Sequence, residues 1–480
     1  MTKQECAIKY ITENYLDFDR LRHDVIADKL QIRLSSEEAI SLSDEVAMRL
    51  SGEEIEYWRE LTKHDINSIV CHAAQEYDAN ITSREVMTAL QSDLIPDVHP
   101  LREYIQSLRP YTPEQPDWID MVASQVHVMD ASATDRCEAP VDCHSVAVDG
   151  RSATPIDLHS QSTASRASDL QCSASETNYS KANYSSHIER SKADRLWRVC
   201  FKKWFVAMVA SWMKDEVVNH QVLVLIGRQG IYKTTWLEHL LPPHLRAYAC
   251  KLANSNDLNK DERLRIAEFG LISLDEIDSM NNRELNQLKS VITASDVNER
   301  AAYAYTKERR VRLASFCASG NRRDFLTDIT GNRRWLPFEV ESIQNPFFTT
   351  LPYELMYAQA WALAQDPRFS YWFELEEIEV LEQHNQHFRD ESNEEQLLPI
   401  LFDIPAEGKG EFLTTAQISE RLVTYGNIKK PMALSRLGMV LGAAGYQSTR
   451  PKIGGRLIRG WLVYQRDTNE IASLKQLLKE

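Results

Sequence analysis

Apolar side chains follow two different spacings along this chain, and the change between them divides the chain into regions. Over residues 1–128 apolar positions recur three or four residues apart, for instance at Ile8 and Ile11, which predicts a helical N-terminal region. Over residues 193–345 short apolar runs such as 222–226 alternate with helical stretches. This alternation is typical of an α/β domain whose parallel strands are buried on both faces.

The remaining regions differ in composition. Residues 129–192 hold 17 Ser or Thr in 64 positions and few large apolar side chains, so this stretch buries too little surface to offset its ordering entropy. We predict a disordered linker or a loop insertion there. The spacing further along predicts a helical connector over 346–410, a winged-helix-like basic domain over 411–467 and a C-terminal tail over 468–480.

Composition narrows the class of protein. The 480 residues are 43% hydrophobic and carry a net charge of −15, which excludes a wholly disordered or fibrous chain and argues against a protein that coats nucleic acid. The eight cysteines include no Cys-x-x-Cys pair, so we predict neither a zinc site nor a disulfide framework. The chain shows no signal peptide and no apolar run of membrane length, and we expect a cytoplasmic protein without a membrane partner.

A candidate phosphate-binding loop lies between the first apolar run of the α/β region and the helix that follows it. Gly227 and Gly230 leave the backbone free to wrap around a phosphate, Lys233 can reach its oxygens, and the Thr234 hydroxyl can hold Mg²⁺. Tyr232 stands where this pattern usually has Gly, and a positive φ there would cost about 1–2 kcal/mol. An ordinary turn before a helix is the alternative interpretation of this segment.

Polar residues follow the later strands of the same region. Asp275 and Glu276 end an apolar run, where the first acid can hold Mg²⁺ and the second can deprotonate an attacking water. Asn321 follows the next run and can reach a γ-phosphate, and Arg333 and Arg334 can stabilise charge across a subunit boundary. The alternatives are helix-capping acids, a buried Asn bonded to backbone, and arginines paired with surface carboxylates.

The order of these motifs resembles the virulence-associated protein E family, helicase-like proteins of phages and genomic islands that are related to superfamily 3 helicases. The motifs that carry the resemblance are Gly-x-Gln-Gly at 227–230, Leu-Asp-Glu at 274–276, and Asp-Ile-Thr-Gly-Asn-Arg-Arg at 328–334. The similarity is dense over about 195–345. It implies a P-loop NTPase core of the AAA+ or superfamily 3 helicase type, which uses ATP and Mg²⁺ and assembles as a homo-oligomeric ring on DNA.

The resemblance also implies a role for each candidate residue. Gly227, Gly230, Lys233 and Thr234 would bind the nucleotide, and Asp275 would join Thr234 as a metal ligand. As catalytic residues it implies Glu276 as the base, Asn321 as the first sensor, and Arg333 or Arg334 as the inter-subunit finger.

Two segments are candidates for contacts with DNA. Residues 300–310 alternate Tyr with basic residues, which predicts a hairpin, and Lys307 is our choice for a phosphate contact. Residues 421–466 hold nine Lys or Arg and no Asp or Glu. Four of these basic residues are predicted to face DNA: Arg436, Arg450, Lys452 and Arg456. A solvated hairpin edge, and a basic surface that docks onto the acidic remainder of the chain, are the alternatives.

The sequence therefore favours an ATP-dependent helicase-like or translocase-like motor that acts on single-stranded or forked DNA during replication of a mobile genetic element. The alternative is a nucleotide-gated DNA-binding regulator, or an oligomerising scaffold that serves, for example, in phage defence.

Overall fold

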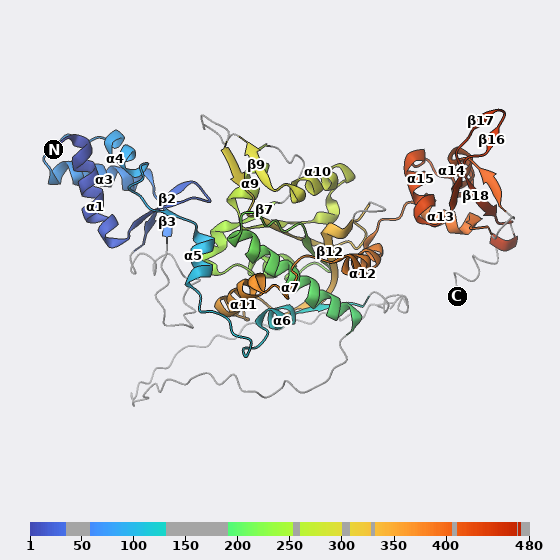
Figure 1. Ribbon diagram of the computed structural model, residues 1–480, viewed down its shortest axis with the longest axis horizontal. Helices are drawn as coiled ribbons and strands as arrows, with labels where there is room; N and C mark the ends of the chain where they lie inside the picture. The colour runs from blue at the N-terminus through green and yellow to red at the C-terminus, as the bar shows by residue number, and fades with distance from the viewer. Residues whose placement is uncertain are drawn as a thin grey trace, which may run out of the picture.

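The computed structural model describes residues 1–34, 58–130, 191–252, 260–299, 308–327, 332–405, 410–467 and 469–471. Figure 1 shows a central sheet with helices on both sides, a smaller N-terminal unit in blue, and C-terminal helices and strands in orange to red at the opposite end. The predicted linker over 129–192 and the predicted tail over 468–480 lie almost entirely outside the described residues.

The N-terminal unit contains a sheet as well as helices, so the prediction of a helical region over 1–128 is wrong in this respect. Its four strands run in the order β3-β2-β1-β4, and three helices bury the apolar core against them. The elements are α1 (Lys3–Asn14), η1 (Leu16–Phe18), β1 (Leu21–Asp24), β2 (Lys29–Arg33), β3 (Trp58–Glu60), α3 (Lys63–Glu76), α4 (Ser83–Leu90) and β4 (Asp97–Val98).

Polar burial explains why these strands have no clear apolar alternation. On β1, Arg22 and Asp24 are buried side chains with polar partners. Asp24 accepts hydrogen bonds from Tyr248 Oη at 2.6 Å and from Gln31 Nε2 at 3.1 Å, and Arg22 donates to Glu103 at 2.7 Å. Tyr248 and Glu103 lie beyond the N-terminal unit, so β1 joins that unit to the central domain through hydrogen bonds.

The predicted boundary at residue 128 also moves. The segment from α5 (Pro100–Ser107) through α6 (Trp118–Ala123) to β5 (Val126–Val128) packs into the main core of the central domain. Strand β5 pairs antiparallel with the last strand of the central sheet. The central domain therefore begins near residue 100, well before the stretch of low hydrophobicity.

The central sheet has six strands in the order β5-β12-β6-β11-β8-β7, parallel apart from β5. All five side chains of β6 are buried, as its continuous apolar run predicts. The five parallel strands are β6 (Val222–Ile226), β7 (Ala249–Leu252), β8 (Leu271–Leu274), β11 (Ser315–Gly320) and β12 (Trp335–Ile343). The prediction of a largely parallel α/β sheet is confirmed.

Two layers of helices cover this sheet. Leu223 and Leu225 face the layer that contains α7, α8 and α11, whereas Val222, Val224 and Ile226 face α9 and α10. These helices are α7 (Lys192–Met213), α8 (Lys233–Glu238), α9 (Lys260–Glu268), α10 (Asn282–Thr293) and α11 (Tyr353–Gln365), with the short turns η3 (Pro243–Tyr248) and η4 (Ile277–Ser279) between them. In the part of the chain that the structure describes, no helix is long and apolar enough to cross a membrane.

The predicted hairpin is present as the antiparallel pair β9 (Asp296–Glu299) and β10 (Glu308–Val311). Its base is fixed by Arg312, which is 1% exposed and donates to carbonyl oxygens. The guanidinium bonds the oxygens of Ile292 and Ala294 at the end of α10, and that of Asn219 ahead of β6 at 2.9 Å. A buried cation at the negative end of a helix dipole is favourably placed, and it joins the hairpin base to the sheet.

The C-terminal domain combines three helices with a small antiparallel sheet in which β18 pairs with β13, β14 and β15. The region 346–410 is helical as predicted, but α11 belongs to the central core and α13 to the C-terminal core. The remaining elements are η5 (Asn332–Arg334), α12 (Leu375–Asn385), η6 (Gln386–Phe388), α13 (Asn393–Leu401), β13 (Phe402–Asp403), β14 (Glu411–Leu413), α14 (Thr415–Gly426), α15 (Leu434–Ala443), β15 (Gln447–Thr449), β16 (Lys452–Ile453), β17 (Arg456–Leu457) and β18 (Gly460–Gln465). The winged-helix-like assignment stays a prediction.

The cap of α5 makes this fold sensitive to acid. Burial, with the nearby charge of Arg102, lowers the pKa of His99 to about 4, and its Nδ1 accepts the Arg102 N–H at 3.2 Å. The unfolded chain takes up this proton near pH 6.5 and the folded chain only near pH 4, so folding loses up to about 3 kcal/mol as pH falls between these values. His99→Asn keeps a capping oxygen and should remove that loss, as measured by urea unfolding from pH 7 to pH 4. Parallel pH dependences for the two proteins would contradict it.

Candidate active site

The loop between β6 and α8 is shaped by three residues with unusual backbone requirements. A Cβ on Gly227 would lie 2.6 Å from the carbonyl oxygen of Val340 on the neighbouring strand, and Gly230 has a φ of +84°. Tyr232 adopts the left-handed conformation with a φ of +67°, directly before the first residue of α8. The positive φ expected at this position is therefore present, and a tyrosine occupies it.

Lys233 turns back into this loop. Its ammonium donates to the carbonyl oxygens of Gly227 at 2.8 Å and Arg228 at 2.7 Å, and lies 3.3 Å from Asn321 Oδ1. The side chain is 7% exposed. Burial lowers the pKa of Lys233, while the nearby carboxylates of Asp278 and Asp275 oppose that shift. A cation held by carbonyl dipoles in this way is already positioned to meet an anion.

Thr234 and Asp275 meet across the sheet, as the predicted metal site requires. Asp275 Oδ1 accepts a hydrogen bond from Ser319 Oγ at 2.8 Å and lies 3.3 Å from Thr234 Oγ1. Its Oδ2 lies 3.1 Å from Lys251 Nζ. Burial opposes ionisation of this carboxyl, but the hydrogen bonds from Ser319 and Lys251 outweigh it and lower the pKa of Asp275. The carboxylate is therefore ionised at neutral pH.

Glu276 and Asn321 follow β8 and β11, at the carboxyl ends of these two strands. Glu276 has a φ of +53° and an exposed side chain. Asp278 accepts the backbone N–H groups of Asn321 and Arg322, each at 3.1 Å. It thereby fixes the segment that carries Asn321.

These side chains line one cavity of about 330 Å³. Its walls are Gln229, Gly230, Tyr232, Lys233, Thr234, Thr235, Asp275, Glu276, Ser319, Gly320 and Asn321. The described residues contain no group of three or more His, Cys, Asp or Glu side chains that could by itself hold a metal ion. One hydroxyl and one carboxylate oxygen fit Mg²⁺, a hard cation that takes its remaining ligands from water and phosphate.

Arg333 and Arg334 lie at the amino ends of the parallel strands, whereas this cavity lies at their carboxyl ends. They form the turn η5 immediately before β12, and the first residue of β12 is paired with the first residue of β6. The phosphate loop instead follows the last residue of β6. The two arginines are thus separated from their own cavity by the length of a strand, and neither lines it.

Of the five basic residues predicted to contact DNA, three are exposed, one contacts the central domain and one lies outside the described residues. Lys307 lies outside the described residues, between β9 and β10. Arg436, on α15, donates to the carbonyl oxygen of Thr327 at 3.1 Å and therefore contacts the central domain. Arg450, Lys452 and Arg456 are exposed around the β16–β17 hairpin.

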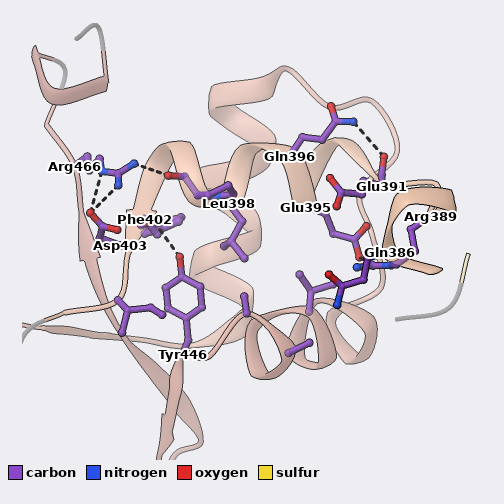
Figure 2. A pocket seen from close by; sticks show the side chains of 15 residues that line it. Gln386, Arg389, Glu391, Glu395, Gln396, Leu398, Phe402, Asp403, Tyr446 and Arg466 are labelled. Atoms are coloured by element: carbon purple, nitrogen blue, oxygen red, sulfur yellow. Dashed lines mark hydrogen bonds and ion pairs between the residues drawn. The ribbon is translucent and has the colours of Figure 1, made fainter. Parts of the chain in front are cut away.

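A second cavity, of about 700 Å³, lies between η6, α13 and α15 (Figure 2). Its two arginines each contact a carboxylate: Arg389 lies 3.1 Å from Glu395, and Arg466 lies 2.7 Å from Asp403. Tyr446 donates to the carbonyl oxygen of Phe402 at 3.0 Å across the same space. Although this cavity is larger than the loop cavity, each of its arginines already has a carboxylate partner, and the chemistry expected for a nucleotide lies in the loop cavity.

Ser319 lines the loop cavity and Lys251 contacts it through Asp275, but the sequence singled out neither residue. Ser319 lies near the end of β11, two residues before Asn321. A polar residue inside an otherwise apolar run could have marked it as a site residue. Lys251 comes from the edge strand β7, and only the pairing of β7 with β8 brings it to Asp275.

Residues 175–394 match the family model of the virulence-associated protein E-like domain, and the resemblance carried by the motifs is confirmed for this part of the chain. Two solved structures are similar. The apo structure of the NrS-1 C-terminal region (305–718) is 11% identical, covering 96% of this chain and all of that one, with a TM-score of 0.42. The A form apo structure of that region is also 11% identical, with coverages of 92% and 96% and a TM-score of 0.41. Neither carries a functional conclusion, and no curated protein matches this sequence.

The loop geometry yields a prediction about its two glycines. Gly227→Ala should lower the free energy of unfolding by about 1–3 kcal/mol, because the new methyl group meets a backbone oxygen that cannot move aside. Gly230→Ala has open space around its Cβ and should lose only about 1 kcal/mol, from its positive φ. Urea unfolding of both variants checks this, and equal losses would contradict it.

Proposed function

We propose that this chain, which carries a virulence-associated protein E-like domain over residues 175–394, is a P-loop ATPase that drives movement on DNA during replication of a phage or another mobile element. One observation supports this most strongly. Lys233, Thr234, Asp275, Glu276 and Asn321 follow three adjacent parallel strands and line a single cavity. Ligand sites in open α/β sheets lie at the carboxyl ends of the strands.

Each of these residues has a chemical task in the proposed reaction. The loop N–H groups and Lys233 would bind the β- and γ-phosphates of ATP, and Asn321 would contact the γ-phosphate from the neighbouring strand. Glu276 would take the proton from the attacking water. Mg²⁺, held by Thr234 and Asp275, would neutralise charge on the phosphate oxygens when bound.

The position of Arg333 and Arg334 supports assembly into a ring. Because these arginines lie at the far edge of the sheet from their own cavity, a head-to-tail contact is the arrangement in which they can serve a nucleotide. Such heterologous contacts close into rings when the rotation allows it. An arginine supplied by the neighbouring subunit would then stabilise the charge that develops in phosphoryl transfer.

Contacts with DNA are proposed at two places. The β9–β10 hairpin follows α10 in the chain, and its base is joined to the sheet by Arg312. The exposed Arg450, Lys452 and Arg456 form a basic group on the C-terminal domain. Phosphate contacts of this kind hold a protein on DNA without selecting a sequence.

A second candidate function is a nucleotide-gated DNA-binding regulator or scaffold that binds ATP without turning it over. The observation that favours it is Tyr232, whose left-handed conformation strains the residue next to Lys233. Glu276 in the same cavity favours the ATPase, since binding without turnover requires no base.

Hydrolysis measurements separate these functions. With Mg²⁺, the protein should hydrolyse ATP faster when single-stranded DNA is added, and Lys233→Ala should abolish turnover and weaken ATP binding. Glu276→Gln should lower turnover by about 10²–10⁴-fold while ATP still binds, because only the base is lost. Binding without turnover in the unmodified protein would instead establish the regulator or scaffold.

Mixing variants tests the inter-subunit arginine. The double variant Arg333→Ala/Arg334→Ala should be inactive, as should Lys233→Ala, because each lacks one half of the proposed composite site. An equal mixture should recover up to about a quarter of the normal turnover, since that fraction of subunit contacts has both halves intact. A mixture of Lys233→Ala with Glu276→Gln is the control and should recover nothing. Activity retained by the double variant would refute the arginine assignment.

A further inference from the structure

Three aromatic side chains next to the phosphate loop are exposed. Tyr232 is 38% exposed, Phe347 62% and Phe348 85%, whereas the large aromatic residues of α7 are fully buried. Tyr232 lines the loop cavity and Phe347 contacts the Tyr232 ring. Exposed apolar rings beside a cavity are candidates for a ligand contact.

Two of these rings come from separate segments that meet at the loop. The turn that carries Phe347 and Phe348 follows the carboxyl end of β12, the strand beside β6. Tyr232 and Phe347 contact each other edge to face, with ring centroids 6.5 Å apart and planes at 82°. His239, on the segment after α8, meets Phe347 in the same manner at 5.6 Å.

Asn345 holds this arrangement in place. Its Nδ2 donates to Tyr232 Oη at 3.3 Å, and its Oδ1 accepts the Phe347 N–H at 3.0 Å. Its carbonyl oxygen accepts the Phe348 N–H at 3.1 Å. The Asn345 side chain thus links the turn after β12 to the tyrosine of the loop and holds the Tyr232 and Phe347 rings in one arrangement.

We propose that Tyr232 and Phe347 form the nucleobase subsite of the loop cavity and take a purine ring by stacking. This rests on the proposed function, because Tyr232 lines the cavity in which Lys233 would bind the phosphates. A nucleobase needs an apolar, planar contact within reach of that cavity. Tyr232 directly precedes Lys233 in the chain, so the Cα atoms of the two residues are only about 3.8 Å apart. The ring therefore starts next to the phosphate-binding lysine.

The proposal accounts for the residue that least fits the loop. Glycine would occupy the left-handed position without strain, but it would supply no ring. A tyrosine there trades backbone strain for contact with the base. Stacking tolerates every base and strengthens with the size of the ring, so the subsite should favour ATP and GTP over CTP and UTP with little discrimination between the two purines.

Binding measurements with and without a base test this subsite. The probes are Mg-ATP, Mg-CTP and tripolyphosphate with Mg²⁺, titrated into the full chain by calorimetry. Phe347→Ala should weaken ATP binding by about 5- to 100-fold, the range of one lost stacking contact, and leave tripolyphosphate binding unchanged. Tyr232→Gly should do the same with the backbone relaxed, and Tyr232→Phe should retain binding because the ring remains. Phe18→Ala, at a ring 59% exposed in the N-terminal unit, is the matched control.

The results of these titrations separate failure of the nucleobase subsite from failure of the proposed ATPase function. If ATP binds in a Lys233-dependent manner but Phe347→Ala and Tyr232→Gly leave its affinity unchanged, the subsite is refuted and the ATPase stands. Equal loss of ATP and tripolyphosphate in Phe347→Ala would also refute it, since the ring would then support the phosphate loop. If none of the three probes binds the unmodified protein, the proposed function itself fails.

Discussion

The burial of β6 on both faces is the constraint on which the candidate site depends. Leu223 and Leu225 point into one helical layer, and Val222, Val224 and Ile226 into the other. A strand enclosed in this way can neither slip in register nor rotate without exposing apolar surface. The chain that leaves its carboxyl end is therefore delivered to one place. The neighbouring strands β8, β11 and β12 run in the same direction, so their last residues arrive at the same edge and bring acids, an amide and aromatic rings to the loop.

Charge at that edge is arranged before any ligand arrives. Lys233 is held by two carbonyl oxygens, and Asp275 by the Ser319 hydroxyl and the Lys251 ammonium. Lys251 thus lies on Oδ2 of Asp275, whereas Thr234 lies on Oδ1, so a divalent cation held between Thr234 and Oδ1 need not displace the lysine. Such fixed dipoles require little reorganisation when charge develops, which is the main electrostatic advantage that a protein site has over water.

The parts of the fold that could be predicted are those whose signal is local. The apolar run of β6, the glycines of the loop and the acids after β8 each lie within a few consecutive residues, and the structure brings them together as expected. The strands of the N-terminal unit escaped prediction because β1 buries Arg22 and Asp24 through partners far along the chain. Lys251 and Phe347 escaped for a related reason, since their relevance follows only from which strands are neighbours. Lys307 lies outside the described residues, so its role stays a prediction.

Arg312 shows how the site is connected to the surface that would contact DNA. It follows directly after β10, and its guanidinium bonds carbonyl oxygens at the end of α10 and ahead of β6. Helix α10 begins shortly after Glu276, and β6 ends at the phosphate loop. The hairpin base, the helix that follows the acids and the strand that carries the loop are therefore joined at one buried side chain. Because a buried donor that loses its acceptors is costly, these elements should shift together.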